Sequence, residues 1–375
     1  MTLLLLTLLG CSSDKDSAEP LAPEPLDLPA DPAVQGAPVG VRTETIGGVS
    51  VEIWYPAAQA EAGGAGESID PTVFVPQVVL DVLGPLQLPA MSTYAIRDAQ
   101  LRPPVEPYPL VLFSHGFGGF RLQSVDVTTH LASRGYIVAA VDHPGRMLGD
   151  VLPCLFLPVL EGCDLSGFTD DPGPDDLSDL LDLVSGLADE GWLEGAVDLE
   201  RIAVGGHSAG ANTTTSFGQD QDHIAALFPM AGGAPVERDV PTLFLAGSCD
   251  SYPDLGSVTA SAAGTAQAEL VAISGAGHLA FSDLCELDLA RFAADYLEGR
   301  DDVNVATYES LLALATDGCP GRVPQESTGC DSFLDLQTSD PIIRHYTTVF
   351  LDEALRGEGE GVQAGVYAEA ELITP

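Results

Sequence analysis

Residues 204–210 read V-G-G-H-S-A-G and directly follow the apolar run R-I-A-V at 201–204. The motif G-x-S-x-G is a weak signal alone, because the chain holds 40 glycines among 375 residues. Its surroundings strengthen it: a strand-like run precedes Ser208, and A-N-T-T-T, which can begin a helix, follows. A sharp strand–turn–helix junction strains the nucleophile's backbone, and only neighbours as small as Gly206 and Gly210 leave room for it. The stretch therefore predicts a reactive serine.

A serine hydroxyl is a poor nucleophile at neutral pH, so a base and a carboxylate that orients the base are needed. The expected base is His278, in the glycine-rich stretch I-S-G-A-G-H-L-A after the last predicted strand. The expected acid is Asp250, which follows the strand at 242–246, with Asp254 as the alternative. A lone aspartate or histidine is more often structural, but the order Ser208, Asp, His along the chain favours a catalytic triad.

An oxyanion hole requires two N–H groups where negative charge develops. The loop S-H-G-F-G-G-F, after another buried strand, can supply one from Phe117. Ala209, which follows the nucleophile at the start of its helix, can supply the other.

The remaining candidates near strand ends receive other roles. His115 and His207 adjoin glycines on turn segments and are expected to brace the backbone rather than to react. His143, in V-D-H-P-G, and Phe120 are expected to line the substrate pocket, with simple packing as the alternative for His143.

The hydrophobic pattern predicts an α/β protein with a mostly parallel central sheet and helices on both faces. Helices are expected at 123–133 and 174–190, with a final amphipathic helix near the C-terminal end. Two loop-rich insertions, 146–173 and 282–338, are expected to form a rim or cap above the active site. The expected strands are 49–56, 110–113, 136–141, 201–204, 224–228, 242–246 and 268–273.

The N-terminal stretch M-T-L-L-L-L-T-L-L-G-C, residues 1–11, is too short to span a bilayer and resembles a lipoprotein signal peptide in which Cys11 is lipidated. No Lys or Arg precedes its apolar run, and a coincidental apolar start is the alternative. A proline- and acid-rich tether at 12–39, one domain at 40–358 and an acidic tail at 359–375 are expected to follow. The protein is thus expected to be exported and held at a bacterial cell envelope by a lipid anchor alone.

The formal charge of −42 repels nucleic acid and anionic surfaces at long range. The expected partner is a small-molecule or lipid ester, and a monomer is expected. Apart from Cys11, six of the seven cysteines remain, an even number that indicates disulfides in an exported protein. No C-x-x-C spacing supports a zinc site, and no metal or organic cofactor is implied. Proximity favours the pairs Cys154–Cys163, Cys249–Cys285 and Cys319–Cys330 among 15 possible connectivities.

Three stretches carry a family resemblance: V-E-I-W-Y-P at 51–56, the run P-L-V-L-F-S-H-G-F-G-G-F-R at 109–121, and L-A-S-R-G-Y-I-V-A-A-V-D-H-P-G at 131–145. Together with G-G-H-S-A-G, they resemble the platelet-activating factor acetylhydrolase branch of the α/β-hydrolases. G-A-G-H is similar to the dienelactone hydrolase and bacterial polyester hydrolase (cutinase-like) branches. The resemblance implies an α/β-hydrolase fold and a serine carboxylester hydrolase that forms an acyl-enzyme on Ser208.

One departure from the acetylhydrolase branch concerns the acid. That branch places it after the strand that follows the nucleophile helix, but the stretch I-A-A-L-F-P-M-A-G-G at 224–233 contains no Asp or Glu. Asp250 matches the position used by the polyester and dienelactone branches. This departure weakens the inference that the chain acts on the lipid-mediator substrate of the acetylhydrolase branch. Similarity to polyester hydrolases implies that a Cys249–Cys285 bond ties the two triad loops together. Short-acyl phospholipids and polyesters are both possible substrates, and the alternatives are ligand binding only, acyl transfer or peptide hydrolysis.

Overall fold

A ten-stranded sheet forms the centre of the computed structural model, which describes residues 22–58, 66–85, 88–156, 171–287 and 334–374. The strand order is β12-β11-β10-β9-β8-β6-β7-β2-β1-β5. The strands from β7 across to β11 pair in parallel, whereas β2 joins β7, and β12 joins β11, antiparallel. The strands of this sheet are β1 (Val39–Ile46), β2 (Val49–Pro56), β5 (Ala95–Arg97), β6 (Tyr108–Ser114), β7 (Ile137–Val141), β8 (Val197–His207), β9 (Ile224–Met230), β10 (Pro241–Gly247), β11 (Gln267–Ile273) and β12 (Ala370–Ile373).

The central strands are buried on both faces, as expected for parallel strands covered by helices. Every residue of β6 and of β7 is buried. Alternate side chains of β6 enter different cores: Val111 and Phe113 pack in one hydrophobic cluster, and Leu110 and Leu112 in the other. The continuous apolar runs of these strands thus build two cores with one sheet between them.

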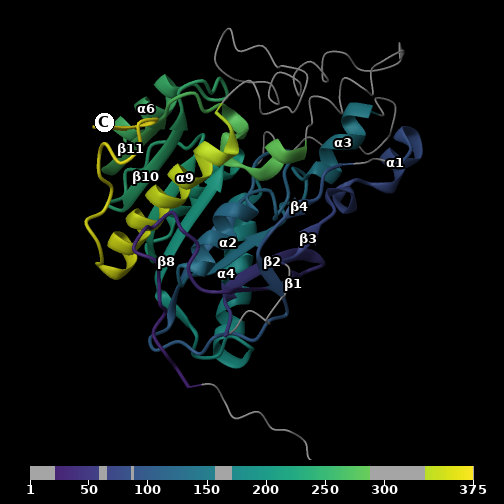
Figure 1. Cartoon of the computed structure of the whole chain (residues 1–375). Helices are drawn as coiled ribbons and strands as arrows, with labels where there is room; N and C mark the ends of the chain where they lie inside the picture. The colour runs from purple at the N-terminus through teal and green to yellow at the C-terminus, as the bar shows by residue number, and fades with distance from the viewer. Residues whose placement is uncertain (1–21, 59–65, 86–87, 157–170, 288–333, 375) are drawn as a thin grey trace, which may run out of the picture.

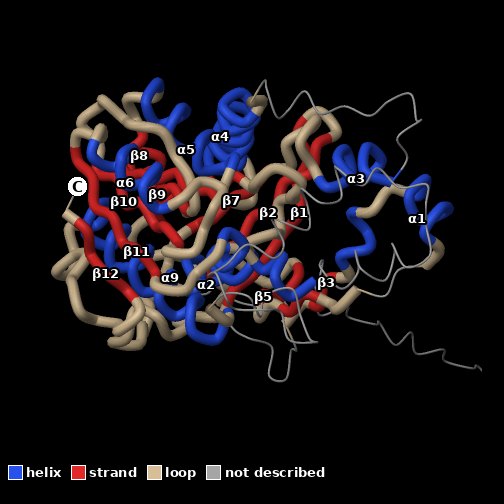
Figure 2. The backbone as a smooth tube through the Cα atoms, turned by 90° about the horizontal axis from the view of Figure 1, so that it is seen from above, coloured by secondary structure: helices blue, strands red, loops and turns tan. Residues whose placement is uncertain are grey.

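Helices cover both faces of the sheet (Figures 1 and 2). One face carries α2 (Val125–Ser133) and α9 (Leu336–Leu351), which contribute to the first cluster. The opposite face carries α4 (Gly173–Glu190) and α5 (Ala209–Asp220), which contribute to the second. The prediction of an α/β sheet flanked by helices is confirmed.

Smaller elements complete the described chain. No helix among the described residues is both long and apolar enough to cross a membrane. The smaller α-helices are α1 (Gln77–Leu83), α3 (Leu148–Phe156) and α6 (Leu255–Ala263). Short 3₁₀ turns lie at Pro71–Phe74, His278–Phe281 and Asp283–Leu287, and a π-helical turn lies at Asp352–Arg356. A separate two-stranded sheet pairs β3 (Ser68–Ile69) with β4 (Met91–Ser92).

The segment expected to be a tether, 12–39, instead packs against the domain over much of its described part. The carbonyl oxygen of Pro32 accepts a hydrogen bond from His130 Nε2 (2.9 Å), and that of Pro29 accepts one from Arg134 Nη1 (3.0 Å). Part of this stretch is not extended, because a turn at 31–34 is closed by the Val34 N–H, which donates to the Asp31 carbonyl oxygen (3.1 Å). The proline carbonyl oxygens provide acceptors for donors near the C-terminal end of α2. The composition did not predict this docking.

The segment expected to be an acidic tail, 359–375, is also part of the domain. Val362 and Ala370 are buried, and β12 pairs with β11 along its whole length. This pairing covers an edge of the sheet that β11 would otherwise expose. Four residues, A-E-L-I, are too few to reveal a strand within a Gly- and Glu-rich sequence.

Several expectations lie wholly or partly outside the described residues. Cys11 and the signal peptide are among these, as are most of the insertions 146–173 and 282–338. Cys249 forms a disulfide. The side chains of the other predicted disulfide cysteines are not among those described, so the pairings stay predictions.

The buried His130 predicts a loss of stability in acid. Burial lowers its pKa from 6.5 to about 3. Between these values the unfolded chain binds a proton that the native protein does not, so the free energy of unfolding falls as pH falls, by up to about 1.4 kcal/mol per pH unit for one histidine. Urea unfolding between pH 4 and 6.5 should show a shallower loss for His130→Gln than for the wild type. Substitution of the exposed His223 by Gln is the control and should keep the wild-type slope, and equal slopes for all three proteins would contradict the prediction.

Candidate active site

Ser208 lies at the junction between β8 and α5 in a strained backbone conformation, with φ 59° and ψ −117°. Its N–H donates to the Met230 carbonyl oxygen on the neighbouring strand β9 (2.9 Å). A Cβ atom on Gly206 would lie 2.4 Å from the Gly210 carbonyl oxygen, and one on Gly210 would lie 2.0 Å from the Ser114 carbonyl oxygen. Both positions therefore require glycine, because the offending atoms belong to the main chain.

The structure brings Ser208, His278 and Asp250 into one hydrogen-bonded chain. His278 Nε2 lies 2.8 Å from Ser208 Oγ, and His278 Nδ1 lies 2.9 Å from Asp250 Oδ2. With its Nδ1 proton donated to the carboxylate, the imidazole presents a lone pair on Nε2 to the serine hydroxyl. Asp250 also accepts the Tyr252 N–H (2.7 Å), which fixes the carboxylate. The three side chains come from segments that follow β8, β10 and β11 at the carboxyl edge of the sheet.

Asp254, the alternative acid, lies elsewhere. It is exposed and caps α6, where Oδ1 accepts the Ser257 N–H (2.8 Å). This hydrogen bond lowers the pKa of Asp254. Asp254 therefore serves as a helix cap, and His278 forms its hydrogen bond with Asp250 instead.

Phe117 and Ala209, the expected oxyanion donors, both line the pocket that contains Ser208. Ala209 is the first residue of α5, so its N–H has no partner within the helix. The loop that carries Phe117 approaches Ser208 closely, because a Cβ atom on Gly116 would lie 3.2 Å from Ser208 Cβ. The loop glycines thus bring backbone, rather than side chains, next to the serine.

His115 and His207 contact main-chain groups around the site, as expected for bracing residues. His115 Nδ1 donates to the Gly116 carbonyl oxygen (2.7 Å), while its Nε2 accepts the His143 N–H (3.0 Å). His207 Nε2 donates to the His278 carbonyl oxygen (2.9 Å). Burial lowers the pKa of His115 and of His207 to about 3, so both rings are neutral at physiological pH.

Gln123 is a site residue that the sequence did not reveal. Its Oε1 accepts the Gly116 N–H (3.2 Å) and its Nε2 donates to His207 Nδ1 (3.0 Å). The amide thereby joins residues 115–120, called the oxyanion loop below because they include the expected donor Phe117, to the strand β8 that leads to Ser208. No motif marks this glutamine, because its role depends on two segments that are distant in sequence.

The expectation that His143 and Phe120 line the pocket is wrong for the pocket formed by the described residues. His143 is fully buried, with Nε2 2.9 Å from Ser114 Oγ and Nδ1 2.8 Å from Asp176 Oδ2. The Phe120 ring stacks on Phe74, with centroids 4.0 Å apart. A position near a strand end indicates closeness to the site, but it does not give the direction of the side chain.

The pocket beside Ser208 has a volume of about 390 Å³. Seven of its eleven described lining residues carry hydrogen-bonding side chains, and no leucine, isoleucine, valine or methionine is among the eleven. The lining residues are Phe117, Arg146, Asp171, Ser208, Ala209, Asn212, Gly233, Tyr252, Pro253, Ser257 and Ser261.

The sheet topology and the serine on a strand–turn–helix junction, facing a histidine and an aspartate from later loops, are those of the α/β-hydrolase fold. A similar solved structure is the ferulic acid esterase from Streptomyces cinnamoneus, with a TM-score of 0.59 over 90% of this chain and 96% of that chain. At 21% sequence identity this likeness establishes the fold alone.

Sequence comparison gives a partial family match. The family model described as "Platelet-activating factor acetylhydrolase, isoform II" matches residues 44–147, a stretch that includes the oxyanion loop and ends before Ser208. The platelet-activating factor acetylhydrolase of Bos taurus is 50% identical over 54 residues, which are 14% of this chain and 12% of that protein. The Cavia porcellus enzyme of the same name is 32% identical over 91 residues, 24% of this chain and 19% of that protein. The matched segments thus span less than one fifth of these relatives.

The close contacts around Gly210 and the open surroundings of Gly186 predict opposite effects on stability when each glycine is replaced by alanine. Gly210→Ala should lower the free energy of unfolding by about 2–3 kcal/mol, because its methyl group overlaps the Ser114 carbonyl oxygen. Gly186→Ala is the control: Gly186 is exposed within α4, a Cβ atom there meets nothing within 4 Å, and the substitution should stabilise by about 0.5–1 kcal/mol. Urea unfolding measures both values, and a Gly210→Ala protein as stable as the wild type would contradict the described packing.

Proposed function

We propose that the protein is a serine carboxylester hydrolase that acts through an acyl-enzyme on Ser208. The observation that carries the proposal is the continuous hydrogen-bonded chain from Ser208 Oγ through His278 to Asp250, beside an open pocket. A nucleophile bonded to a base that is itself oriented by a carboxylate is the arrangement that activates a serine.

The proposed reaction begins when Ser208 Oγ attacks the ester carbonyl carbon while His278 Nε2 takes the hydroxyl proton. Asp250 stabilises the imidazolium that forms, and the N–H groups of Phe117 and Ala209 stabilise the oxyanion. The imidazolium then returns its proton to the alkoxide leaving group as the C–O bond breaks, which leaves an acyl-serine. Water then attacks the acyl-serine while His278 takes its proton. The acyl C–Oγ bond breaks as the imidazolium gives that proton to Ser208 Oγ, which releases the acid and restores the serine hydroxyl.

The proposed substrate is a neutral or lipid-like ester, with short-acyl phospholipids and polyesters as the two classes to test. The match of residues 44–147 to the platelet-activating factor acetylhydrolase family supports the first class. The position of the acid after β10, rather than after β9, weakens it. Hydrolysis rates on a series of p-nitrophenyl esters, an oxidised short-chain phospholipid and a polyester film would distinguish these classes.

Replacement of the nucleophile should abolish hydrolysis and leave the fold intact. Ser208→Ala removes the only atom that forms the acyl-enzyme, so kcat for p-nitrophenyl acetate should fall to the background rate while the far-UV circular dichroism spectrum is unchanged. Retention of more than a few per cent of the wild-type kcat would show that Ser208 is not the nucleophile. A wild-type protein that hydrolyses none of the esters would favour a protein that only binds a ligand.

A matched pair of variants tests the acid. Asp250→Asn should lower kcat by about 10³–10⁴-fold, because the amide favours the wrong imidazole tautomer and does not stabilise the imidazolium. Asp254→Asn is the control, since asparagine caps helices about as well as aspartate and the residue lies outside the triad. Its kcat and its thermal midpoint should remain near wild type. The reverse ranking of the two variants would assign the role to Asp254.

A further inference from the structure

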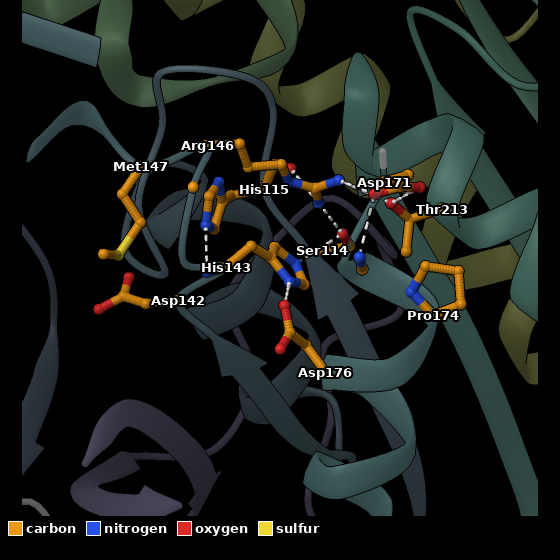
Figure 3. A network of polar contacts seen from close by, with 12 residues as sticks. Ser114, His115, Asp142, His143, Arg146, Met147, Asp171, Pro174, Asp176 and Thr213 are labelled. Carbon is orange, nitrogen blue, oxygen red and sulfur yellow. Dashed lines mark hydrogen bonds and ion pairs between the residues drawn. The ribbon is translucent and has the colours of Figure 1, made fainter. Parts of the chain in front are cut away.

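Arg146 is a fully buried arginine at the wall of the pocket, and it bonds to groups on several segments (Figure 3). Its Nη2 donates to Ser114 Oγ (2.7 Å) and to the His115 carbonyl oxygen (2.9 Å). Its Nη1 donates to Thr213 Oγ1 (2.9 Å) and forms an ion pair with Asp171. The proposed acyl transfer has no direct use for this cation, so its contacts need another explanation.

On one side, Arg146 holds the oxyanion loop. The His115 carbonyl oxygen, which accepts from Nη2, lies two residues before Phe117. The Gly118 N–H, one residue after Phe117, donates to the main-chain carbonyl oxygen of Arg146 (2.8 Å). A single residue therefore fixes the loop on both sides of the first expected oxyanion donor.

On the other side, Arg146 contacts the nucleophile helix at Thr213, the fifth residue of α5. Thr213 Oγ1, which accepts from Nη1, lies 3.1 Å from the Ala209 carbonyl oxygen and 2.9 Å from Asp171 Oδ2, and its one proton can go to either. Ala209 is the second expected oxyanion donor. One guanidinium thus connects both segments that supply the N–H groups.

We propose that Arg146 is a positioning residue that sets the separation and orientation of the Phe117 and Ala209 N–H groups. The proposal rests on the proposed function, since it concerns the oxyanion hole of that reaction. Donors that already point to the position of the oxyanion need no reorganisation when charge develops, and this is the source of their effect on kcat.

Two buried side chains, Ser114 and His143, link the guanidinium to the half-buried Asp176 (Figure 3). Ser114 Oγ accepts from Arg146 and can donate to His143 Nε2 (2.9 Å), and His143 Nδ1 can donate to Asp176 Oδ2 (2.8 Å). The charges of Asp171 and Asp176 raise the pKa of Arg146, and burial raises the pKa of Asp176 itself to about 7. Burial lowers the pKa of Arg146 to about 10, so the guanidinium remains charged at neutral pH.

The geometry requires arginine rather than a positive charge alone. Two guanidinium nitrogens in one plane reach acceptors on β6, on the oxyanion loop, on α5 and at Asp171. A lysine ammonium is a single point with three donors and cannot span these acceptors together. Arg146→Lys therefore keeps the charge and removes the bridge.

The test compares Arg146→Lys with Arg344→Lys in the full-length protein. Arg344 forms a partly buried ion pair with Asp126 between α9 and α2, away from the pocket. With kcat normalised to sites titrated by a fluorophosphonate, Arg146→Lys should lower kcat about 10²-fold, as expected for a misplaced oxyanion donor. KM should change less than about threefold, because the proposed contacts position protein groups and do not bind substrate. Arg344→Lys should keep the wild-type kcat per titrated site.

A folded Arg146→Lys protein with kcat within threefold of wild type, or with its loss confined to KM, would overturn the proposal. If Arg146→Lys does not fold, Thr213→Val tests the same bridge, since valine keeps the shape and removes the hydroxyl that links Arg146 to α5. A loss of about tenfold in kcat at unchanged KM supports the proposal, and an unchanged kcat overturns it. Failure of the proposed function gives a different result: the wild type hydrolyses no ester, or Ser208→Ala remains active.

Discussion

The backbone of Ser208 is the constraint on which the site depends. Its φ of 59° and ψ of −117° turn the chain from β8 directly into α5, and such a conformation persists only where the surroundings impose it. The surroundings here are main-chain atoms: a Cβ atom on Gly206 would lie 2.7 Å, and one on Gly210 2.0 Å, from the carbonyl oxygen of Ser114 at the end of β6. This close approach brings the nucleophile, the start of its helix and the oxyanion loop to one point. The packing of two parallel strands therefore supplies the geometry that the proposed chemistry uses.

The three histidines around Ser208 differ in the groups that they contact. His115 and His207 are neutral at physiological pH because burial lowers the pKa of each to about 3, and both rings bond to main-chain groups. His278 alone among these three contacts both a carboxylate and Ser208 Oγ. Among these three rings, that of His278 is therefore the one placed to accept a proton from the nucleophile, and the other two hold the loops.

The sequence predicted those parts that depend on local pattern. Apolar runs identified the central strands, and the order of Ser208, Asp250 and His278 identified side chains that the fold brings to one edge of the sheet. Features that depend on contacts between distant segments were not predicted. Gln123 and Arg146 carry no motif, because each acts by joining pieces of chain that are far apart in sequence. The docking of the N-terminal segment and the strand β12 were missed for the same reason, since composition describes a segment and not the surface that receives it.

The most direct test of the central claim is the site of covalent labelling by a fluorophosphonate, located by peptide mass spectrometry on the native wild-type protein. The account predicts one phosphonyl group per chain, on the peptide that contains Ser208, with no labelling when the protein is unfolded before the reagent is added. Labelling on a different residue, or a native protein that remains unmodified at reagent excess, would contradict the claim that the Ser208–His278–Asp250 chain activates this serine.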